Sequence, residues 1–312
     1  MSEPTLSVVV PVFDEEAVID AAFERLRAVL VAMGEPFEIL FVDDGSRDST
    51  PAHLERLRAA DARVGVVTLS RNFGHQMAIS AGMEMARGRA IVVIDADLQD
   101  PPEVIPRLVE RWRAGADVVY ARRIERRGES AFKRGSAAAF YRLLGRLAEV
   151  PIPAEAGDFR LVDRRVRDVL VRMPERRRFV RGMVAWTGFR QEAVDYVRDA
   201  RAAGRSKYSL ARMLRLAADA LLSFSDRPAR WVAGAGAVLF ALSCAALVVL
   251  AVTAAAPWWW VLAAVAALDG VVLLSLGVVG AYAARIYDEV RGRPPYVVAQ
   301  SHPPAQAAEG EP

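Results

Sequence analysis

The chain has 312 residues, of which 53% are hydrophobic and 25% charged, and it carries a formal net charge of +3. This length allows one large domain or two smaller ones, and a mean hydropathy of +0.17 is too high for an ordinary soluble enzyme. The single cysteine, Cys244, excludes a disulfide framework, and we expect no nucleic-acid partner.

The first 120 residues alternate between two patterns. Short apolar runs bounded by polar residues predict buried strands, and apolar residues at helical spacing predict the helices between them. In chain order we expect a strand at 6–12, a helix at 15–33, a strand at 37–42, a helix from Ser49 or Thr50, a strand at 64–69, a helix near 75–87, a strand at 90–95, a helix from Glu103 and a strand at 116–121. This alternation predicts an α/β fold whose mostly parallel sheet has helices on both faces.

Polar side chains gather where the predicted strands end. The groups are Asp14, Glu15 and Glu16; Asp43 and Asp44; Arg71 and Asn72; Asp95 and Asp97; and Arg122 and Arg123. Ligands of such sheets bind at the carboxyl ends of the strands. The glycine-rich loops that cradle phosphates are missing from the sequence, but carboxylates can hold a divalent cation that in turn binds a diphosphate.

The stretch VVIDADLQDPP, residues 92–102, is the most informative of these strand ends. Three carboxylates there need water, a cation or a cationic ligand, because a carboxylate is costly to desolvate. One interpretation is a solvated turn in which Asp100 caps the next helix. The other is a metal site, in which Asp95 and Asp97, two residues apart, lie near one ion.

After residue 122 the alternation stops and basic amphipathic segments follow. Apolar and basic residues divide the segments at 130–150 and 209–225 in the manner of helices that lie in a membrane surface, although helices packed on the sheet would show the same pattern. Basic runs such as 176–178 and 204–209 are often solvated surfaces, but beside a membrane they can meet lipid head groups or a lipid-linked phosphate.

The C-terminal third contains a long apolar region. No charged residue occurs from Trp231 to Leu268, and Pro257 with the three tryptophans that follow divides the region into two candidate membrane spans, about 231–253 and 258–284. A buried helical hairpin in a soluble protein is the alternative. Asp269, inside the second span, indicates either a helix–helix contact within a homo-oligomer or a protonated side chain satisfied in its own hairpin.

The flanks of these spans set the expected orientation. Arginines precede the first span and follow the second, so the positive-inside rule places the preceding domain and both termini in the cytoplasm of a multi-pass plasma-membrane protein. We expect no signal peptide at the start of the chain. The expected domains are 1–225, 226–290 with the two spans, and a disordered cytoplasmic tail at 291–312.

Nine segments in order give the chain a family resemblance. They are VVVPVFDEE, FVDDGSRDST, LSRNFGHQMAISAG, DADLQDPPEVIP, VYARR, AGDFRLVDRR, RRRFVRGMVAWTGF, GRSKYS and SFSDRP. The sequence resembles family 2 glycosyltransferases of the Rossmann-like GT-A fold from about Leu6 to Pro295. More narrowly, it is similar to bacterial polyprenyl-phosphate glycosyltransferases with two C-terminal transmembrane helices, which are relatives of dolichyl-phosphate mannose synthase.

The resemblance implies a reaction and a set of site residues. The reaction is the inverting transfer of a sugar from a nucleotide-sugar donor, more often a UDP-sugar than a GDP-sugar, to the phosphate of a membrane polyprenyl phosphate such as undecaprenyl phosphate. It implies Mg²⁺ or Mn²⁺ held by Asp95, Asp97 and Gln99, and catalytic roles for Asp97, Arg122 and Asp158. The implied nucleotide-sugar site adds Pro11, Phe13, Glu15, Val42, Asp44, Ala96, Arg201 and Lys207, and the implied acceptor-phosphate site consists of Arg123, Arg134, Arg181, Ser206 and Lys207.

One departure and two alternatives accompany this interpretation. The segment FDEE has Asp14 where many relatives have an asparagine, which adds charge but keeps the pattern. A processive polysaccharide synthase would share the fold, but its Q-x-x-R-W motif would need glutamine where RPARW has Arg227. A membrane-anchored nucleotide-sugar-binding scaffold without catalysis is the other alternative, and the sequence does not identify the donor sugar.

Overall fold

The computed structural model describes residues 4–125, 156–176, 178–197 and 258–304, with scattered positions between 232 and 245. The chain divides into two units. Unit 1 comprises residues 1–142, 150–209 and 294–312, and unit 2 comprises residues 143–149 and 210–293.

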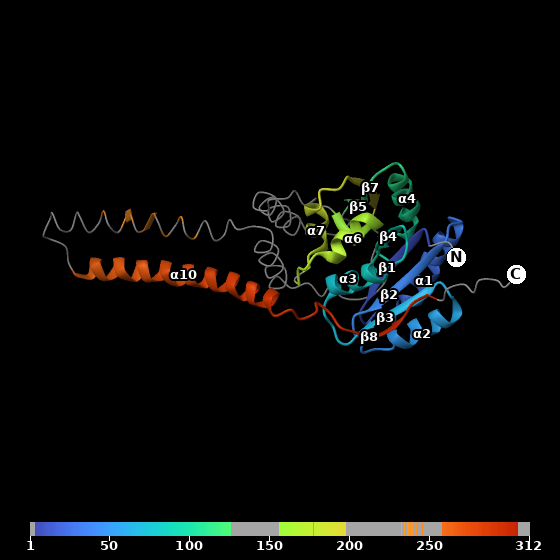
Figure 1. Cartoon of the computed structure of the whole chain (residues 1–312), viewed down its shortest axis with the longest axis horizontal. Helices are drawn as coiled ribbons and strands as arrows, with labels where there is room; N and C mark the ends of the chain where they lie inside the picture. Colours follow the sequence, from blue (N-terminus) through green and yellow to red (C-terminus); the bar gives the residue numbers. More distant parts are fainter. Residues whose placement is uncertain are drawn as a thin grey trace. The chain divides into compact units, whose positions relative to one another are not determined.

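Unit 1 is built on a mixed sheet of eight strands in the order β7-β5-β6-β4-β1-β2-β3-β8 (Figure 1). The strands are β1 Leu6–Val12, β2 Phe37–Asp43, β3 Val64–Leu69, β4 Ala90–Val93, β5 Val118–Glu125, β6 Ala156–Asp163, β7 Gln191–Val197 and β8 Val298–His302. The four central strands β4, β1, β2 and β3 run parallel, whereas β6 and β8 run antiparallel to their neighbours. The carboxyl ends of the central strands therefore share one edge, where a ligand site forms in such sheets.

Helices cover both faces of this sheet. On one face lie α1 Ile19–Ala32, α2 Thr50–Ala60, the short η1 Pro102–Val104 and α4 Ile105–Arg113; on the other lie α3 His75–Met85, α6 Arg164–Arg172 and α7 Val180–Trp186. The α/β class and the mostly parallel sheet predicted from the sequence are confirmed. The central strands are buried on both faces, which explains their nearly continuous apolar sequences.

Helix α3 lies unusually close to the sheet because it presents Gly82 to it. A Cβ atom at Gly82 would lie 2.3 Å from Cγ1 of Val9 and 3.0 Å from Cγ2 of Val42, so no larger residue fits without movement. This close packing fixes the position of the helix. Its first residue, His75, consequently has a defined place at the ligand edge of the sheet.

Two predicted boundaries differ from the structure for local reasons. The first helix begins at Ile19 rather than residue 15, because Asp14 has a positive φ of 53° and starts a turn. The fourth strand ends at Val93 rather than residue 95, because residues 96 and 97 form a turn. Both differences lengthen the loops at the carboxyl ends of the strands.

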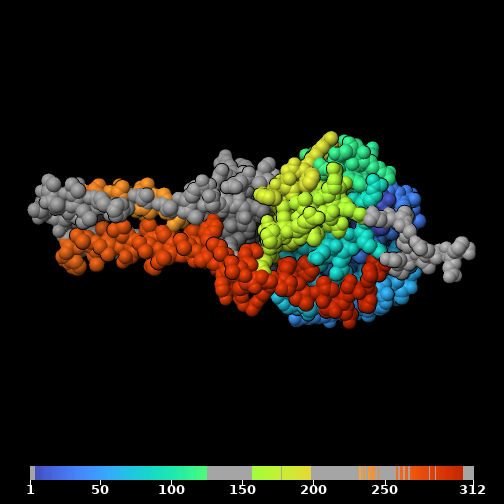
Figure 2. All heavy atoms as spheres, viewed as in Figure 1, coloured from blue at the N-terminus to red at the C-terminus, as the bar shows by residue number. Residues whose placement is uncertain are grey.

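The expectation of a disordered tail at 291–312 is wrong for its central part. Val298–His302 form β8, which pairs antiparallel with β3 at the edge of the sheet and lies on the surface of unit 1 (Figure 2). Pro304 packs where a side chain at residue 65 would lie, since a Cβ atom on Gly65 would be 2.5 Å from the proline ring. The unpaired backbone N–H and C=O groups of an edge strand can pair with such a segment even when the side chains of the segment are exposed. Residues 305–312 lie outside the described residues.

Unit 2 contributes the long helix α10, Trp258–Val290. Within it, Leu268–Val290 is long and apolar enough to cross a membrane, and it is the one such helix among the described residues. The predicted second span, 258–284, lies within α10, and Asp269 is exposed there. Most of the predicted first span, 231–253, and the predicted surface helices at 130–150 and 209–225 lie outside the described residues, so the two-helix hairpin is not established.

Candidate active site

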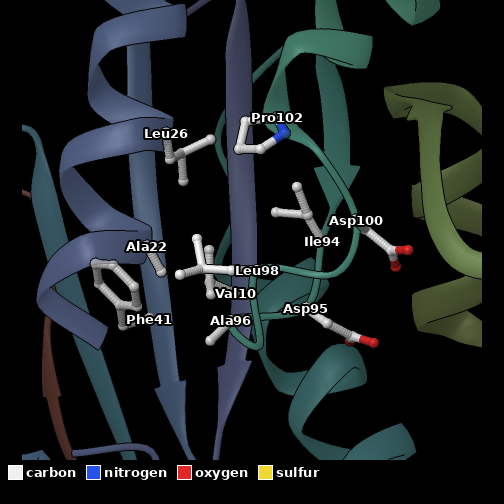
Figure 3. A pocket seen from close by; sticks show the side chains of 10 residues that line it. All are labelled: Val10, Ala22, Leu26, Phe41, Ile94, Asp95, Ala96, Leu98, Asp100 and Pro102. Carbon is white, nitrogen blue, oxygen red and sulfur yellow. The ribbon is translucent and has the colours of Figure 1, made fainter. Parts of the chain in front are cut away.

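The loop after β4 carries the D-x-D sequence and separates an apolar side from a polar side. Ala96 is buried, and Leu98 contributes to a small apolar pocket with Leu26 and Phe41 (Figure 3). The carboxylates of Asp95 and Asp100 point away from that pocket in the same view. The apolar side chains therefore anchor the loop while its acidic side chains face the ligand edge.

Leu98 has a strained backbone conformation. Its φ of 59° is in the left-handed region, which a branched side chain rarely adopts. Such strain persists only when the surroundings hold the residue in place, and it is typical of functional loops. The strain lies between Asp97 and Gln99, two of the predicted metal ligands.

His75 joins the D-x-D loop to Asp158 of β6. Its Nε2 lies 3.3 Å from Oδ2 of Asp158 and 3.5 Å from Oδ1 of Asp95. Because one nitrogen serves two carboxylates, the predicted metal ligand and the predicted catalytic carboxylate lie in one cluster. The sequence predicted their proximity but did not single out the histidine between them.

Arg181 completes the surroundings of Asp158. Its Nε and Nη2 donate to the two carboxylate oxygens over 2.9 and 3.0 Å, a bidentate pair. Helix α7 is held for this contact because the N–H of Val180 donates over 3.0 Å to the side chain of Gln76, one residue after His75. Arg181, predicted to bind the acceptor phosphate, therefore lies beside Asp158.

The cluster has perturbed acid–base properties. Burial raises the pKa of Asp158, but the charge and hydrogen bonds of Arg181 and His75 prevail and hold it well below its usual range. Burial lowers the pKa of His75, but its hydrogen bond to Asp158 and the charge of Asp95 raise it to about 9. Burial and nearby carboxylates raise the pKa of Asp95 to about 6, although His75 opposes the shift.

Arg160, on the same strand as Asp158, adds a second guanidinium to that of Arg181. It is 3% exposed, and its Nη2 donates over 2.7 Å to the carbonyl of Gly157. Among the described residues its Nε has no hydrogen-bond acceptor, and burial lowers its pKa to about 10. Asp158 therefore has two guanidinium groups near it, those of Arg181 and Arg160, and such groups suit an anionic ligand.

The D-x-D loop fits a divalent cation. Within the part of the chain that the structure describes, Oδ1 of Asp95 is buried without a hydrogen-bond partner and has only the 3.5 Å contact with Nε2 of His75. Oδ1 of Asp97 accepts from the N–H of Gln99 over 3.1 Å. Among the described residues no group of three or more acidic, histidine or cysteine side chains is arranged around a metal position. Two carboxylates are nevertheless the usual protein contribution to Mg²⁺ when substrate phosphates supply further ligands.

The predicted nucleotide residues lie at the ends of β1 and β2. Pro11 and Val42 are paired in register, and Phe13 is half-buried beyond β1. The N–H of Glu15 donates to Thr50 Oγ1 over 2.9 Å, which ties the turn after β1 to the start of α2. Because β1 also pairs with β4, the residues at the end of β1 and the D-x-D loop follow neighbouring strands.

Asp44, predicted to lie beside the base and ribose, also contacts the turn before α3. Its oxygens accept from the N–H groups of Phe73 and Gly74 over 2.7 and 2.9 Å, and its side chain is buried. The carboxylate thus fixes the turn that leads into α3. It positions His75 by holding the residues immediately before it.

The two arginines at the end of β5 are paired with β7. Arg122 makes a bidentate contact with Asp195, with Nε 2.5 Å and Nη2 3.0 Å from its oxygens. The Nε of Arg123 donates to the hydroxyl of Tyr196 over 2.9 Å, and that hydroxyl donates to Asp100. The structure therefore connects Arg123 to the D-x-D loop through Tyr196 and Asp100, whereas Arg122 pairs with Asp195.

The remaining predicted site residues fall elsewhere. Arg134, Arg201, Ser206 and Lys207 lie outside the described residues. His75 and Tyr196 were missed in the sequence. His75 follows a strand end within LSRNFGHQMAISAG, a segment noted only for its resemblance, whereas nothing in the sequence around Tyr196 indicates its partners.

Comparisons with known proteins identify the family. Residues 7–170 match glycosyl transferase family 2. The uncharacterized glycosyltransferase YkcC of Bacillus subtilis is 46% identical over 302 residues, covering 95% of this chain and 94% of that protein. The prophage-derived bactoprenol glucosyl transferase of Shigella flexneri is 37% identical, covering 95% and 98%. The chain therefore belongs to glycosyl transferase family 2.

A solved structure is also similar in part. Glucosyl-3-phosphoglycerate synthase from Mycobacterium tuberculosis, in complex with Mn²⁺, UDP-glucose and phosphoglyceric acid, has 22% sequence identity and a TM-score of 0.48, covering 70% of this chain and 79% of that chain.

Proposed function

We propose that this protein transfers a sugar from a nucleotide sugar, preferably a UDP-sugar, to the phosphate of a membrane polyprenyl phosphate. Family membership and the similarity to a bactoprenol glucosyl transferase support this reaction. The observation that carries the proposal is the cluster of Asp95, His75, Asp158 and Arg181, because it sets a metal-compatible carboxylate beside a cationic region suited to a second phosphate.

The donor would bind across the carboxyl ends of β1, β2 and β4. Asp95, Asp97 and Gln99 would hold the cation, and Mg²⁺ or Mn²⁺ supplies positive charge against the leaving diphosphate when it is bound. Pro11, Phe13 and Val42 would contact the nucleotide. Arg122, with Arg201 and Lys207, would neutralise phosphate charge as it develops.

The acceptor phosphate would approach from the side of Arg181, with Arg123, Arg134, Ser206 and Lys207 as further contacts. A phosphate monoester has a second pKa of about 6, so near pH 7 it is mostly a dianion and needs no base to attack. Asp158 would therefore orient Arg181 and His75 and stabilise positive charge on the sugar. Direct attack on the anomeric carbon forms the new C–O bond as the bond to the diphosphate breaks.

A lipid acceptor also accounts for the apolar C-terminal region. We propose two membrane spans, about 231–253 and 258–284, with the catalytic unit and both termini in the cytoplasm and surface helices near 130–150 and 209–225. Helix α10, with its membrane-compatible segment Leu268–Val290, supports the second span.

One experiment tests the function. The purified protein in detergent is incubated with a panel of nucleotide sugars, with or without undecaprenyl phosphate and with Mg²⁺, Mn²⁺ or EDTA. We expect release of nucleoside diphosphate that requires both lipid and metal, and a lipid-linked monosaccharide as product. Polymer formation would indicate a processive synthase, and nucleotide-sugar binding without any transfer would indicate a scaffold.

A further inference from the structure

The D-x-D loop depends for its position on a strand that carries no predicted site residue. Its amino end is fixed to β1 by the N–H of Ile94, which donates to the carbonyl of Val9 over 3.1 Å. Its far end is Asp100, only 1% exposed. Between them Leu98 holds a strained backbone, so the arrangement of Asp97 requires firm support at both ends.

Tyr196 of β7 supplies that support at the far end. Its hydroxyl donates to Oδ1 of Asp100 over 2.5 Å and accepts from Nε of Arg123 over 2.9 Å, and Nη2 of Arg123 lies 3.6 Å from Oδ2 of Asp100. Three side chains from the loop, β5 and β7 thus form a closed set of contacts. A buried carboxylate with two such partners has one favourable position.

The tyrosine ring is itself held in place. It is 4% exposed and meets the ring of Phe159 edge to face, with centroids 5.9 Å apart. The register of the parallel strands β5 and β7 also sets these contacts, because it brings Arg122 opposite Asp195 and Arg123 opposite Tyr196. Two neighbouring residues of β7 therefore orient two neighbouring arginines of β5.

We propose that Tyr196 is a positioning residue for the metal-binding loop. It acts through Asp100 to hold Asp97 and Gln99 in the arrangement that binds the donor's divalent cation. This inference rests on the proposed function, since it assumes a metal–nucleotide site at the loop. It assigns a role to β7 that neither the sequence motifs nor the family match, which ends at residue 170, indicates.

The test compares Tyr196→Phe with a matched control, Tyr296→Phe. Tyr296 also donates its hydroxyl to a carboxylate, that of Glu84, but it precedes β8 at the opposite edge of the sheet. Both substitutions remove one hydroxyl and keep the ring. Mn²⁺ binding to the EDTA-stripped full-length protein with UDP present is measured by electron paramagnetic resonance, and the melting temperature without metal is recorded for each variant.

We expect Tyr196→Phe to weaken Mn²⁺ binding about 10-fold, the lower end of the range for loss of a partner in direct contact with a metal ligand, because Tyr196 acts through Asp100. Tyr296→Phe should bind Mn²⁺ as the wild type does. In turnover assays the half-maximal Mn²⁺ concentration should rise for Tyr196→Phe and keep the wild-type value for Tyr296→Phe. Equal Mn²⁺ affinity in the two variants would overturn the proposal.

Two further outcomes also decide the role of Tyr196: a Tyr196→Phe variant that does not fold, and a wild-type protein without transfer activity. If Tyr196→Phe does not fold, Asp100→Asn replaces it; weaker Mn²⁺ binding is again expected, and wild-type binding by Asp100→Asn overturns the inference. If the wild-type protein transfers no sugar to polyprenyl phosphate, the proposed function fails. The comparison of Mn²⁺ and UDP binding still decides the role of Tyr196, because it needs no turnover.

Discussion

Replacing Asp158 with asparagine tests the centre of the site. The substitution keeps the shape of the side chain but removes the charge that Arg181 and His75 both contact. Breaking a buried ion pair costs about 3–5 kcal/mol, and Arg181 is partly exposed, so we expect a loss near the lower figure, about 3 kcal/mol. Turnover should fall about 10²- to 10³-fold, the scale of one lost electrostatic contributor.

The assay separates binding from catalysis. Nucleoside diphosphate release gives kcat and KM for donor and lipid, and urea unfolding gives the free energy of unfolding. Asp61→Asn is the matched control, because Asp61 makes a bidentate pair with Arg63 over 2.9 and 2.7 Å just before β3, at the other end of the strands. We expect the control to keep wild-type kcat and Asp158→Asn to keep donor affinity.

Raising the pH distinguishes two roles for Asp158. If it only orients cations and stabilises the sugar, a change from about pH 7 to 8.5 should not rescue Asp158→Asn, because the phosphate acceptor is already a dianion. Rescue at alkaline pH would restore Asp158 as a general base and refute this reasoning.

Three further results are expected. Asp97→Asn should lower turnover at least about 10²-fold, and activity within a few-fold of wild type with unchanged metal dependence would contradict the D-x-D assignment. In EDTA, the contribution of His75 to stability should be complete below pH 6.5 and lost as the pH rises toward 9, because folding raises its pKa. The side chain of His75 is 43% exposed, so the pH at which half of this contribution is lost should lie between 6.5 and 9. Urea unfolding at a series of pH values measures it, and His75→Gln should abolish this pH dependence. Asp269→Leu should reduce oligomer size in detergent if the spans associate; an unchanged size would exclude that contact.

The sheet could be predicted largely because its strands are buried on both faces. The strand at 64–69 was predicted with its observed bounds, since a continuous apolar run between polar residues leaves little choice. Local sequence patterns contain no comparable signal for β8, whose residues are mostly exposed. That strand forms because β3 offers an open edge, and an open edge depends on the strand order, which local patterns do not contain.

The sequence predicted the carboxylates of the candidate site and Arg181, but not His75 or Tyr196. Asp95 and Asp158 stood in recognisable segments, and the structure brings them to one histidine. The sequence did not indicate that Asp44 also holds the turn before α3. Tyr196 lies 96 residues from Asp100 in the chain, so only the pairing of β5 with β7 makes their contact possible.

The geometry around Asp158 also predicts the stereochemistry of the reaction. Both oxygens of Asp158 accept hydrogen bonds from Arg181, and Oδ2 also lies 3.3 Å from His75, so these neighbouring groups already compensate much of its negative charge. Such a carboxylate is a poor nucleophile, so a covalent glycosyl-enzyme intermediate is disfavoured. The phosphate dianion should instead displace the diphosphate in one step, giving a β-linked lipid product from an α-linked donor. Proton NMR of the isolated lipid product measures this directly through the anomeric coupling constant. Retention of configuration would remove single displacement and require a nucleophile other than the acceptor phosphate.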